Sequence, residues 1–296
     1  MSEFLQQLLN GLSLGAIYAL IALGYTMVYG VLRFINFAHS DVFMVGAFIG
    51  YYLGKLVPEG TLWGGLLVLS GARIGCALLG MFIERVVYRP LRHGPTLNVL
   101  ITAIGVSLLL EYTGQIVFGA APRTFPQIFP TANYHVGSLT ISSNQVFVIG
   151  VAILLMIALQ LIVFKTKIGT AMRAVSLNPK AAQLVGVNNN VVISFTFGLG
   201  SALAAAGGIL YAMNYPSIDP LMGVMPGLKA FVAAILGGIG NIPGAALGGL
   251  LLGTVETFIG GSQFSTYKDA IAFAILIVIL LFKPAGLLGK FTIEKV

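Results

Sequence analysis

Residues 165–190 read KTKIGTAMRAVSLNPKAAQLVGVNNN, a basic stretch without a carboxylate between two long apolar segments. Its apolar residues recur at helical spacing in two short groups, one on either side of Pro179. Asn178 is a good N-cap, Pro179 suits a first helical turn, and Gly186 is a natural stop. A basic loop between membrane spans belongs in the cytoplasm. The stretch predicts a short helical module at the inner membrane surface, which either docks on another protein or only anchors the topology.

The composition of the whole chain is that of a membrane protein. Of its 296 residues, 57% are hydrophobic and 8% are charged, and the mean hydropathy is +0.96. These values predict an all-α, polytopic membrane protein. The net charge of +7 reflects Lys and Arg at span ends and does not indicate nucleic-acid binding. Cys76 lies alone in an apolar run, which excludes a disulfide framework.

The apolar segments predict the order of the membrane spans. They cover residues 8–29, 42–56, 62–87, 97–118, 145–164, 191–213, 229–240, 243–259 and 269–282. Because 42–56 and 229–240 are short, we expect about nine crossings, within a range of roughly eight to ten. Most basic residues fall on one side of this arrangement; the other side receives Lys55, Arg123, Lys229 and Lys268. This asymmetry predicts an outer N-terminus and a cytoplasmic C-terminus. No basic residue precedes Arg33, so the first span is expected to be retained.

Two parts of the chain resemble each other. The first span is followed by a polar break, RFINFAHSD, and a short apolar helix; the sixth is followed by NYPSIDPLMG and another. Since these spans run in opposite directions, the halves are expected to be inverted repeats with broken half-helices, as in many transporters. The predicted single permease domain, 1–296, divides into 1–118 (first repeat), 145–164 (linking span), 165–190 (module) and 191–283 (second repeat). The alternative is that Gly-rich apolar sequences resemble each other by chance.

Polar residues inside or beside the spans are candidates for a pathway or gate. Such groups are costly in hydrocarbon and usually face an interior or a cavity. The candidates are Asn36, His39, Asp41, Glu111, Tyr215, Asp219 and Glu256. The alternative is that they are interfacial residues reaching water, which is the interpretation we favour for Glu84 beside Arg85. Glu111 and Glu256 are mid-span, and pairing with Arg73 is left open.

Small residues recur four positions apart, as in Gly46–Gly50–Gly54, Gly244–Gly248 and Gly249–Gly253. This spacing predicts close helix packing in lipid, within one chain rather than between protomers.

Enzyme signatures are nearly absent from the sequence. GLSLG at 11–15 matches G-x-S-x-G by letters but lies in an apolar helical segment. No phosphate-binding G-x-x-x-x-G-K-[ST] occurs, and no residue is a catalytic or metal-ligand candidate. If ATP powers transport, the motor is another chain, and residues 165–190 are the place for it to bind.

Several segments closely resemble the LivH-type permease of branched-chain amino acid ABC importers. They are NGLSLGAIYALIALGYTMVYGVLRFINFAHSDVFMVGAF, IERVVYRP, IGTAMRAVSLNPKAAQLVGV, KAFVAAILGGIGNIPGAALGG and the tail KPAGLLGKFTIEKV. The resemblance covers nearly the whole chain. It implies a multi-pass permease of the bacterial inner membrane that works by alternating access.

The resemblance also implies partners and a coupling site. The expected partners are a LivM-like second permease, two cytoplasmic ATPase subunits and a periplasmic substrate-binding protein. ATP and Mg would be held by the ATPases, with no cofactor on this chain. The residues matching the ATPase-coupling helix are Gly169, Arg173, Ala174, Asn178, Ala182 and Gly186. Permeases for urea, short amides or other neutral amino acids, and a stand-alone secondary transporter, remain alternatives.

Overall fold

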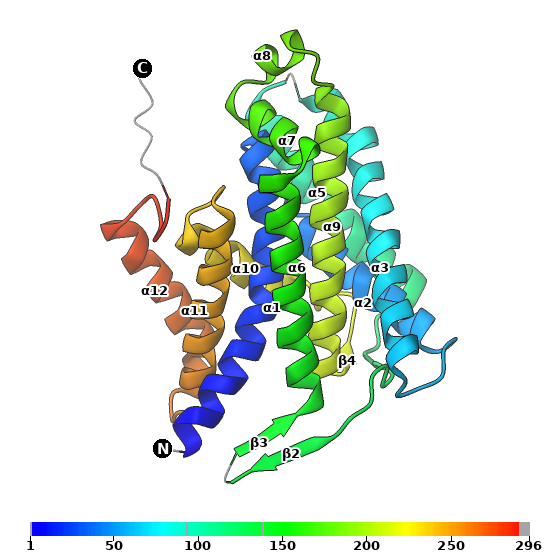
Figure 1. The fold of residues 1–296 in the computed structure, drawn as a ribbon, viewed down its shortest axis with the longest axis vertical. Helices are drawn as coiled ribbons and strands as arrows, with labels where there is room; N and C mark the ends of the chain where they lie inside the picture. The colour runs from blue at the N-terminus through cyan, green and yellow to red at the C-terminus, as the bar shows by residue number, and fades with distance from the viewer. Residues whose placement is uncertain (1, 93, 138, 290–296) are drawn as a thin grey trace.

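The computed structural model describes residues 2–92, 94–137 and 139–289, and its helices form one elongated bundle (Figure 1). His93, Lys290 and Lys295, which belong to the predicted cytoplasmic basic groups, lie outside this range. The long helices are α1 (Ser2–Leu32), α3 (Leu62–Ile83), α5 (Thr96–Phe118), α6 (Ser143–Lys165), α9 (Asn189–Asn214), α11 (Ile242–Gly260) and α12 (Lys268–Phe282). The short ones are α2 (His39–Gly54), α4 (Arg89–Leu91), α7 (Lys167–Leu177), α8 (Pro179–Leu184) and α10 (Val224–Gly237), with a π-helical turn η1 (Glu84–Tyr88) and a 3-10 turn (Ser265–Tyr267).

The described residues contain seven helical segments long and apolar enough to cross a membrane; the last, Ser265–Phe282, combines the 3-10 turn with α12 and has 18 residues. The two predicted short segments are the short helices α2, with 16 residues, and α10, with 14. The chain is therefore a polytopic helical membrane protein, as its composition predicted. The count of about nine crossings, which includes α2 and α10, stays a prediction.

The two ends of the bundle carry different structures. At one end, which we call the module end, α7 lies beside the upper turns of α9 and α8 lies above them (Figure 1). At the opposite end, the hairpin end, lie the N-terminus of α1 and the antiparallel hairpin of β2 (Asn133–Val136) and β3 (Leu139–Ser142). The polar connection 119–144 also holds β1 (Arg123–Thr124), which pairs with β4 (Ser217–Ile218). The predicted inner module and outer loop therefore lie at opposite ends.

Helices α1 and α9 form the centre of the bundle and are almost entirely buried. Helix α1 packs along α11 and α9 along α3; α2 packs on α9 and α3, whereas α10 packs on α1 and α11. These matched contacts are the ones expected if α1–α2–α3 and α9–α10–α11 are related by a two-fold operation. The division into repeats at the predicted boundaries stays a prediction.

Small residues bring the central helices into backbone contact. A Cβ on Gly249 would lie 2.5 Å from the Cα of Ala19, and one on Gly46 would lie 2.5 Å from the Cα of Ala205. Nothing larger than hydrogen fits at either position. The predicted glycine contacts are therefore made within one chain.

Candidate functional site

The module end is shaped by local sequence signals. Thr166 caps α7 by accepting a hydrogen bond from the backbone N–H of Gly169 at 3.1 Å. A Cβ on Gly169 would lie 2.2 Å from the carbonyl oxygen of Ile162, so the sharp bend from α6 into α7 requires glycine. Asn178 Oδ1 accepts from the N–H of Ala181 at 3.0 Å, which confirms the predicted cap.

The rest of the module also follows the predicted signals. Pro179 is the first residue of α8. Gly186 ends the module with a φ of +87°, a left-handed conformation that favours glycine.

The predicted coupling residues are divided between the inside and the surface of the module. Gly169 and Ala182 are buried, whereas Ala174 is half-buried. Arg173 is half-buried as well. Its guanidinium packs on the ring of Phe164 on α6, 5.5 Å from the ring centroid. Its Nη2 donates to Thr170 Oγ1 at 3.3 Å. Arg173 therefore holds α7 against α6 and does not project from the tip.

Three apolar side chains at the C-terminal ends of α7 and α8 are strongly exposed, and the sequence had not indicated them as a contact surface. Leu177 is 80% exposed, Leu184 is 90% exposed and Val185 is 79% exposed. We call these three residues the tip cluster. Ala182, two positions before Leu184 on α8, is buried instead.

The first broken segment, between α1 and α2, buries the candidate residues Asn36, His39 and Asp41. Helix α2 begins at His39, so His39 and Asp41 lie in its first turn and not in the polar break. Asn36 Oδ1 accepts from the hydroxyl of Tyr88 at 2.6 Å, and Asp41 Oδ2 accepts from the hydroxyl of Ser107 on α5. These residues join helices and do not reach water, so the interfacial alternative is wrong for them.

His39 is packed tightly against α1. Its ring lies 4.7 Å from that of Tyr25. A Cβ on Gly24 would come within 2.2 Å of its Nε2. His39 therefore fixes how α2 begins against α1.

The starts of the two short helices meet inside the bundle. A Cβ on Gly223 would lie 2.3 Å from the carbonyl oxygen of Ser40, and one on Gly227 would lie 2.2 Å from Ser40 Cβ. From this contact α2 runs toward the hairpin end, where Gly54 packs on Pro126. Helix α10 runs to the module end, where Gly240 lies against Gly30 of α1. The broken segments therefore supply two half-helices that point in opposite directions.

The polar residues of the second broken segment lie apart from those of the first. The ring of Tyr215 packs 4.7 Å from that of Tyr211, and Asp219 Oδ1 accepts from the N–H of Leu221 at 2.8 Å, which caps a turn. Tyr215 lines a cavity of about 420 Å³ near the hairpin end. Neutral polar side chains from α1, α6 and α9 line it as well: Asn10, Ser13, Asn144, Gln145 and Asn214.

Glu256 belongs to a buried ion cluster. Its Oε1 lies 2.6 Å from Lys229 Nζ, and Tyr18 donates to its Oε2 at 2.9 Å. Lys229 Nζ also lies 2.7 Å from Asp269 Oδ1 on α12. We call Lys229, Glu256, Asp269 and Tyr18 the Lys229 cluster. The partner of Glu256 is therefore Lys229, not Arg73. Lys229, which was predicted on the outer side, is buried inside the bundle, and its side of the membrane stays a prediction.

The structure also places Glu111, the GLSLG segment and Glu84, about which the sequence made separate predictions. Glu111 is half-buried on α5, one turn beyond Ser107. The GLSLG segment lies within the long helix α1, whereas the nucleophile motif lies on a strand-to-helix turn, so the match is one of letters. Glu84, expected at the interface, is fully buried and paired with two arginines.

Known proteins similar to this chain are permeases. Residues 7–280 match the family described as "branched-chain amino acid transport system / permease component". The chain is 42% identical to the high-affinity branched-chain amino acid transport system permease protein BraD of Pseudomonas aeruginosa, over 99% of this chain and 98% of that protein.

Two further relatives extend the comparison. The permease protein LivH of the Escherichia coli high-affinity branched-chain amino acid transport system is 42% identical, over 99% of this chain and 98% of that protein. A probable LivH permease of the archaeon Methanocaldococcus jannaschii is 32% identical, over 91% of this chain and 88% of that protein.

Proposed function

The chain belongs to the family of permease components of branched-chain amino acid transport systems, and from this we propose that it carries branched-chain amino acids across the bacterial inner membrane. The proposal is supported above all by similarity to high-affinity branched-chain amino acid permeases along the full length of the chain. We further propose that it works in an ABC importer with a LivM-like second permease, two ATPase subunits and a soluble binding protein. ATP and Mg would be held on the ATPases.

The tip cluster supports docking of an ATPase at the module end. Leu177, Leu184 and Val185 are exposed beside polar and basic residues, including Lys180. An exposed apolar cluster with a polar rim is typical of a protein-interaction surface. Short helices that present such residues fit a groove on a partner. We therefore assign the contact to the tip cluster, with the buried residues Gly169 and Ala182 shaping the module.

Co-purification with the ATPases tests this assignment. Leu184→Glu places a charge in the proposed contact, and we expect it to lower recovery of the ATPases at least about tenfold, because a buried unpaired charge costs several kcal/mol. The matched control is Gln183→Glu, which adds the same charge at the neighbouring exposed position. Normal recovery with Leu184→Glu would place the docking surface elsewhere.

The substrate pathway is proposed to follow the half-helices α2 and α10. Their abutting starts join segments that lead to opposite ends of the bundle, which suits alternating access. The cavity beside Tyr215 is the candidate entrance from the hairpin end, and its neutral polar lining suits a zwitterion without net charge.

Substrate-stimulated ATPase activity tests the function. The complete transporter in liposomes is given leucine, isoleucine, valine, alanine, glutamate or urea with the binding protein. Stimulation by the three branched amino acids is expected. Stimulation by urea alone would overturn the substrate class, and uptake driven by an ion gradient without ATPases would overturn the importer.

A further inference from the structure

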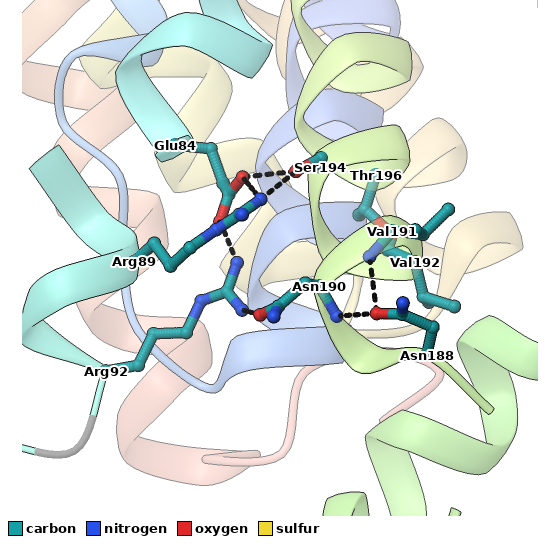
Figure 2. Close-up of polar contacts among 9 residues, drawn as sticks. All are labelled: Glu84, Arg89, Arg92, Asn188, Asn190, Val191, Val192, Ser194 and Thr196. Carbon is teal, nitrogen blue, oxygen red and sulfur yellow. Dashed lines mark hydrogen bonds and ion pairs between the residues drawn. The ribbon is translucent and has the colours of Figure 1, made fainter. Parts of the chain in front are cut away.

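A buried ion cluster lies where α3 ends and α9 begins (Figure 2). Glu84 opens the π-helical turn η1, and its side chain is fully buried. Its Oε2 lies 3.1 Å from Arg89 Nη2, its Oε1 pairs with Arg92 Nη2, and Ser194 Oγ donates to it from α9. We call Glu84, Arg89, Arg92 and Ser194 the Glu84 cluster.

On one side, the Glu84 cluster is joined to the module. Arg92 Nη1 donates to Asn190 Oδ1 at 2.9 Å, in the first turn of α9 (Figure 2). The residue before it, Asn189, donates from Nδ2 to the carbonyl oxygen of Pro179 at 2.9 Å, at the first residue of α8. Two adjacent residues at the start of α9 therefore make hydrogen bonds, one to α8 and the other to Arg92.

On the other side, η1 is joined to the first broken segment. Tyr88, its last residue, is fully buried and donates to Asn36 Oδ1 at 2.6 Å. The Tyr88 ring also packs 5.2 Å from that of Phe34 and 5.3 Å from that of Phe197 on α9. Residues 33–38 lead directly into α2. A displacement of η1 must therefore displace the segment that carries α2.

Separating the members of the Glu84 cluster would cost much free energy, so the elements that carry them are expected to move together. Glu84 is removed from water and depends on donors from η1–α4 and from α9. Removing one partner of a buried ion pair leaves a charge without compensation, which is strongly unfavourable. π-Helical turns are themselves rare, and they occur frequently at functional sites. The start of α9 and η1 therefore move together more easily than they separate.

We propose that the Glu84 cluster transmits displacement of the module to the first broken segment and, through Tyr88 and Asn36, to half-helix α2. This inference rests on the proposed function, in which the module receives the movement of the ATPases. Glu84, Arg92 and Tyr88 are positioning residues: they touch neither substrate nor nucleotide. Their role is to keep the ATPase cycle coupled to the opening of the pathway.

The test separates coupling from docking and folding. The complete transporter carries Tyr88→Phe, which deletes one hydroxyl, or Glu84→Gln, which removes the charge but keeps the shape. Tyr29→Phe, on α1 toward the same end, is the matched control. Three quantities are measured: recovery of the ATPases with the permeases, basal ATPase activity, and stimulation by leucine-loaded binding protein together with leucine uptake.

For Tyr88→Phe we expect normal recovery and normal basal activity, with stimulation and uptake reduced about tenfold, as loss of one buried hydrogen bond predicts. The double variant Asn36→Ala/Tyr88→Phe should show stimulation and uptake no lower than those of the more impaired single variant, because both substitutions remove the same contact. The KM for leucine uptake should stay unchanged in Tyr88→Phe, since the residue does not line the pathway.

Unchanged stimulation in both Tyr88→Phe and Glu84→Gln would overturn the inference. Loss of ATPase recovery in Tyr88→Phe would overturn it as well, because the residue would then support docking. Failure of leucine to stimulate the wild-type complex would instead refute the proposed function, so the two failures are distinguishable.

Discussion

Removing the positive charge of Lys229 should destabilise the bundle strongly. Removing the charge of its carboxylate partner as well should restore most of the lost stability. Lys229→Met keeps the length of the side chain but leaves Glu256 buried without its partner at 2.6 Å. Breaking a buried ion pair from one side costs about 3–5 kcal/mol. Tyr18 still donates to Glu256 at 2.9 Å, and the amino group of Lys268 lies 3.8 Å away on a side chain that is 47% exposed. Because these contacts remain, we expect the free energy of unfolding to fall by about 3 kcal/mol, the lower end of that range.

The double variant Lys229→Met/Glu256→Gln removes both charges. The side-chain carbonyl of the introduced glutamine still accepts the hydroxyl of Tyr18, and Asp269, whose side chain is 38% exposed, is left with access to water. Replacing both members of a buried pair with neutral groups is often nearly neutral. We therefore expect the double variant to lie within about 1 kcal/mol of the wild type.

Thermal unfolding of the detergent-purified protein measures the difference. For a chain of this size, a loss of about 3 kcal/mol corresponds to a Tm roughly 5 °C below that of the wild type. The fraction that remains monodisperse on size-exclusion chromatography after heating gives the midpoint. The reasoning is refuted if Lys229→Met melts with the wild type, or if the double variant melts as low as the single one.

Two glycine substitutions test close approaches. Gly249→Val should lower the thermal unfolding midpoint by several degrees, because its Cβ would lie 2.5 Å from the Cα of Ala19. Gly150→Ala is the control, since a Cβ there has nothing within 4 Å. Equal midpoints for the two variants would contradict the packing. Gly169→Ala, whose Cβ would lie 2.2 Å from the carbonyl oxygen of Ile162, should misplace α7 and reduce ATPase co-purification while membrane insertion stays normal; unchanged co-purification would show that the bend tolerates a side chain.

The local parts of this fold could be predicted from sequence because their causes are local. Asn178, Pro179 and Gly186 set the limits of α8 through a side-chain cap, a fixed φ and a left-handed φ. The two short apolar segments likewise appear as α2 and α10, and the glycine spacing predicted contacts that the structure makes within the chain. Each of these signals acts within a few residues or through the absence of a side chain.

The partners of the buried charges could not be predicted, because they come from distant segments. Glu84 looked interfacial beside Arg85, yet it is bound by Arg89 and Arg92 across a π-helical turn and by Ser194, which is 110 positions away. A π-helical turn changes the angular position of every residue after it, so helical spacing gives the wrong neighbours. Lys229 was predicted to begin a short span on the outer side, but its carboxylate partners Glu256 and Asp269 come from α11 and α12, which its own stretch of sequence does not indicate.

Each of the two buried charge clusters constrains one of the two half-helices of the proposed pathway. The Glu84 cluster fixes η1, whose Tyr88 contacts the segment that leads into α2, whereas the Lys229 cluster holds α10 against α1, α11 and α12. Because the starts of α2 and α10 abut at Ser40, Gly223 and Gly227 with no space for a side chain, neither half-helix shifts without moving the other. A movement received at the module end therefore reaches α2 through Tyr88 and then α10 through this contact, and the Lys229 cluster resists it. If the module receives the movement of an ATPase as proposed, part of the energy of that movement must strain the Lys229 cluster.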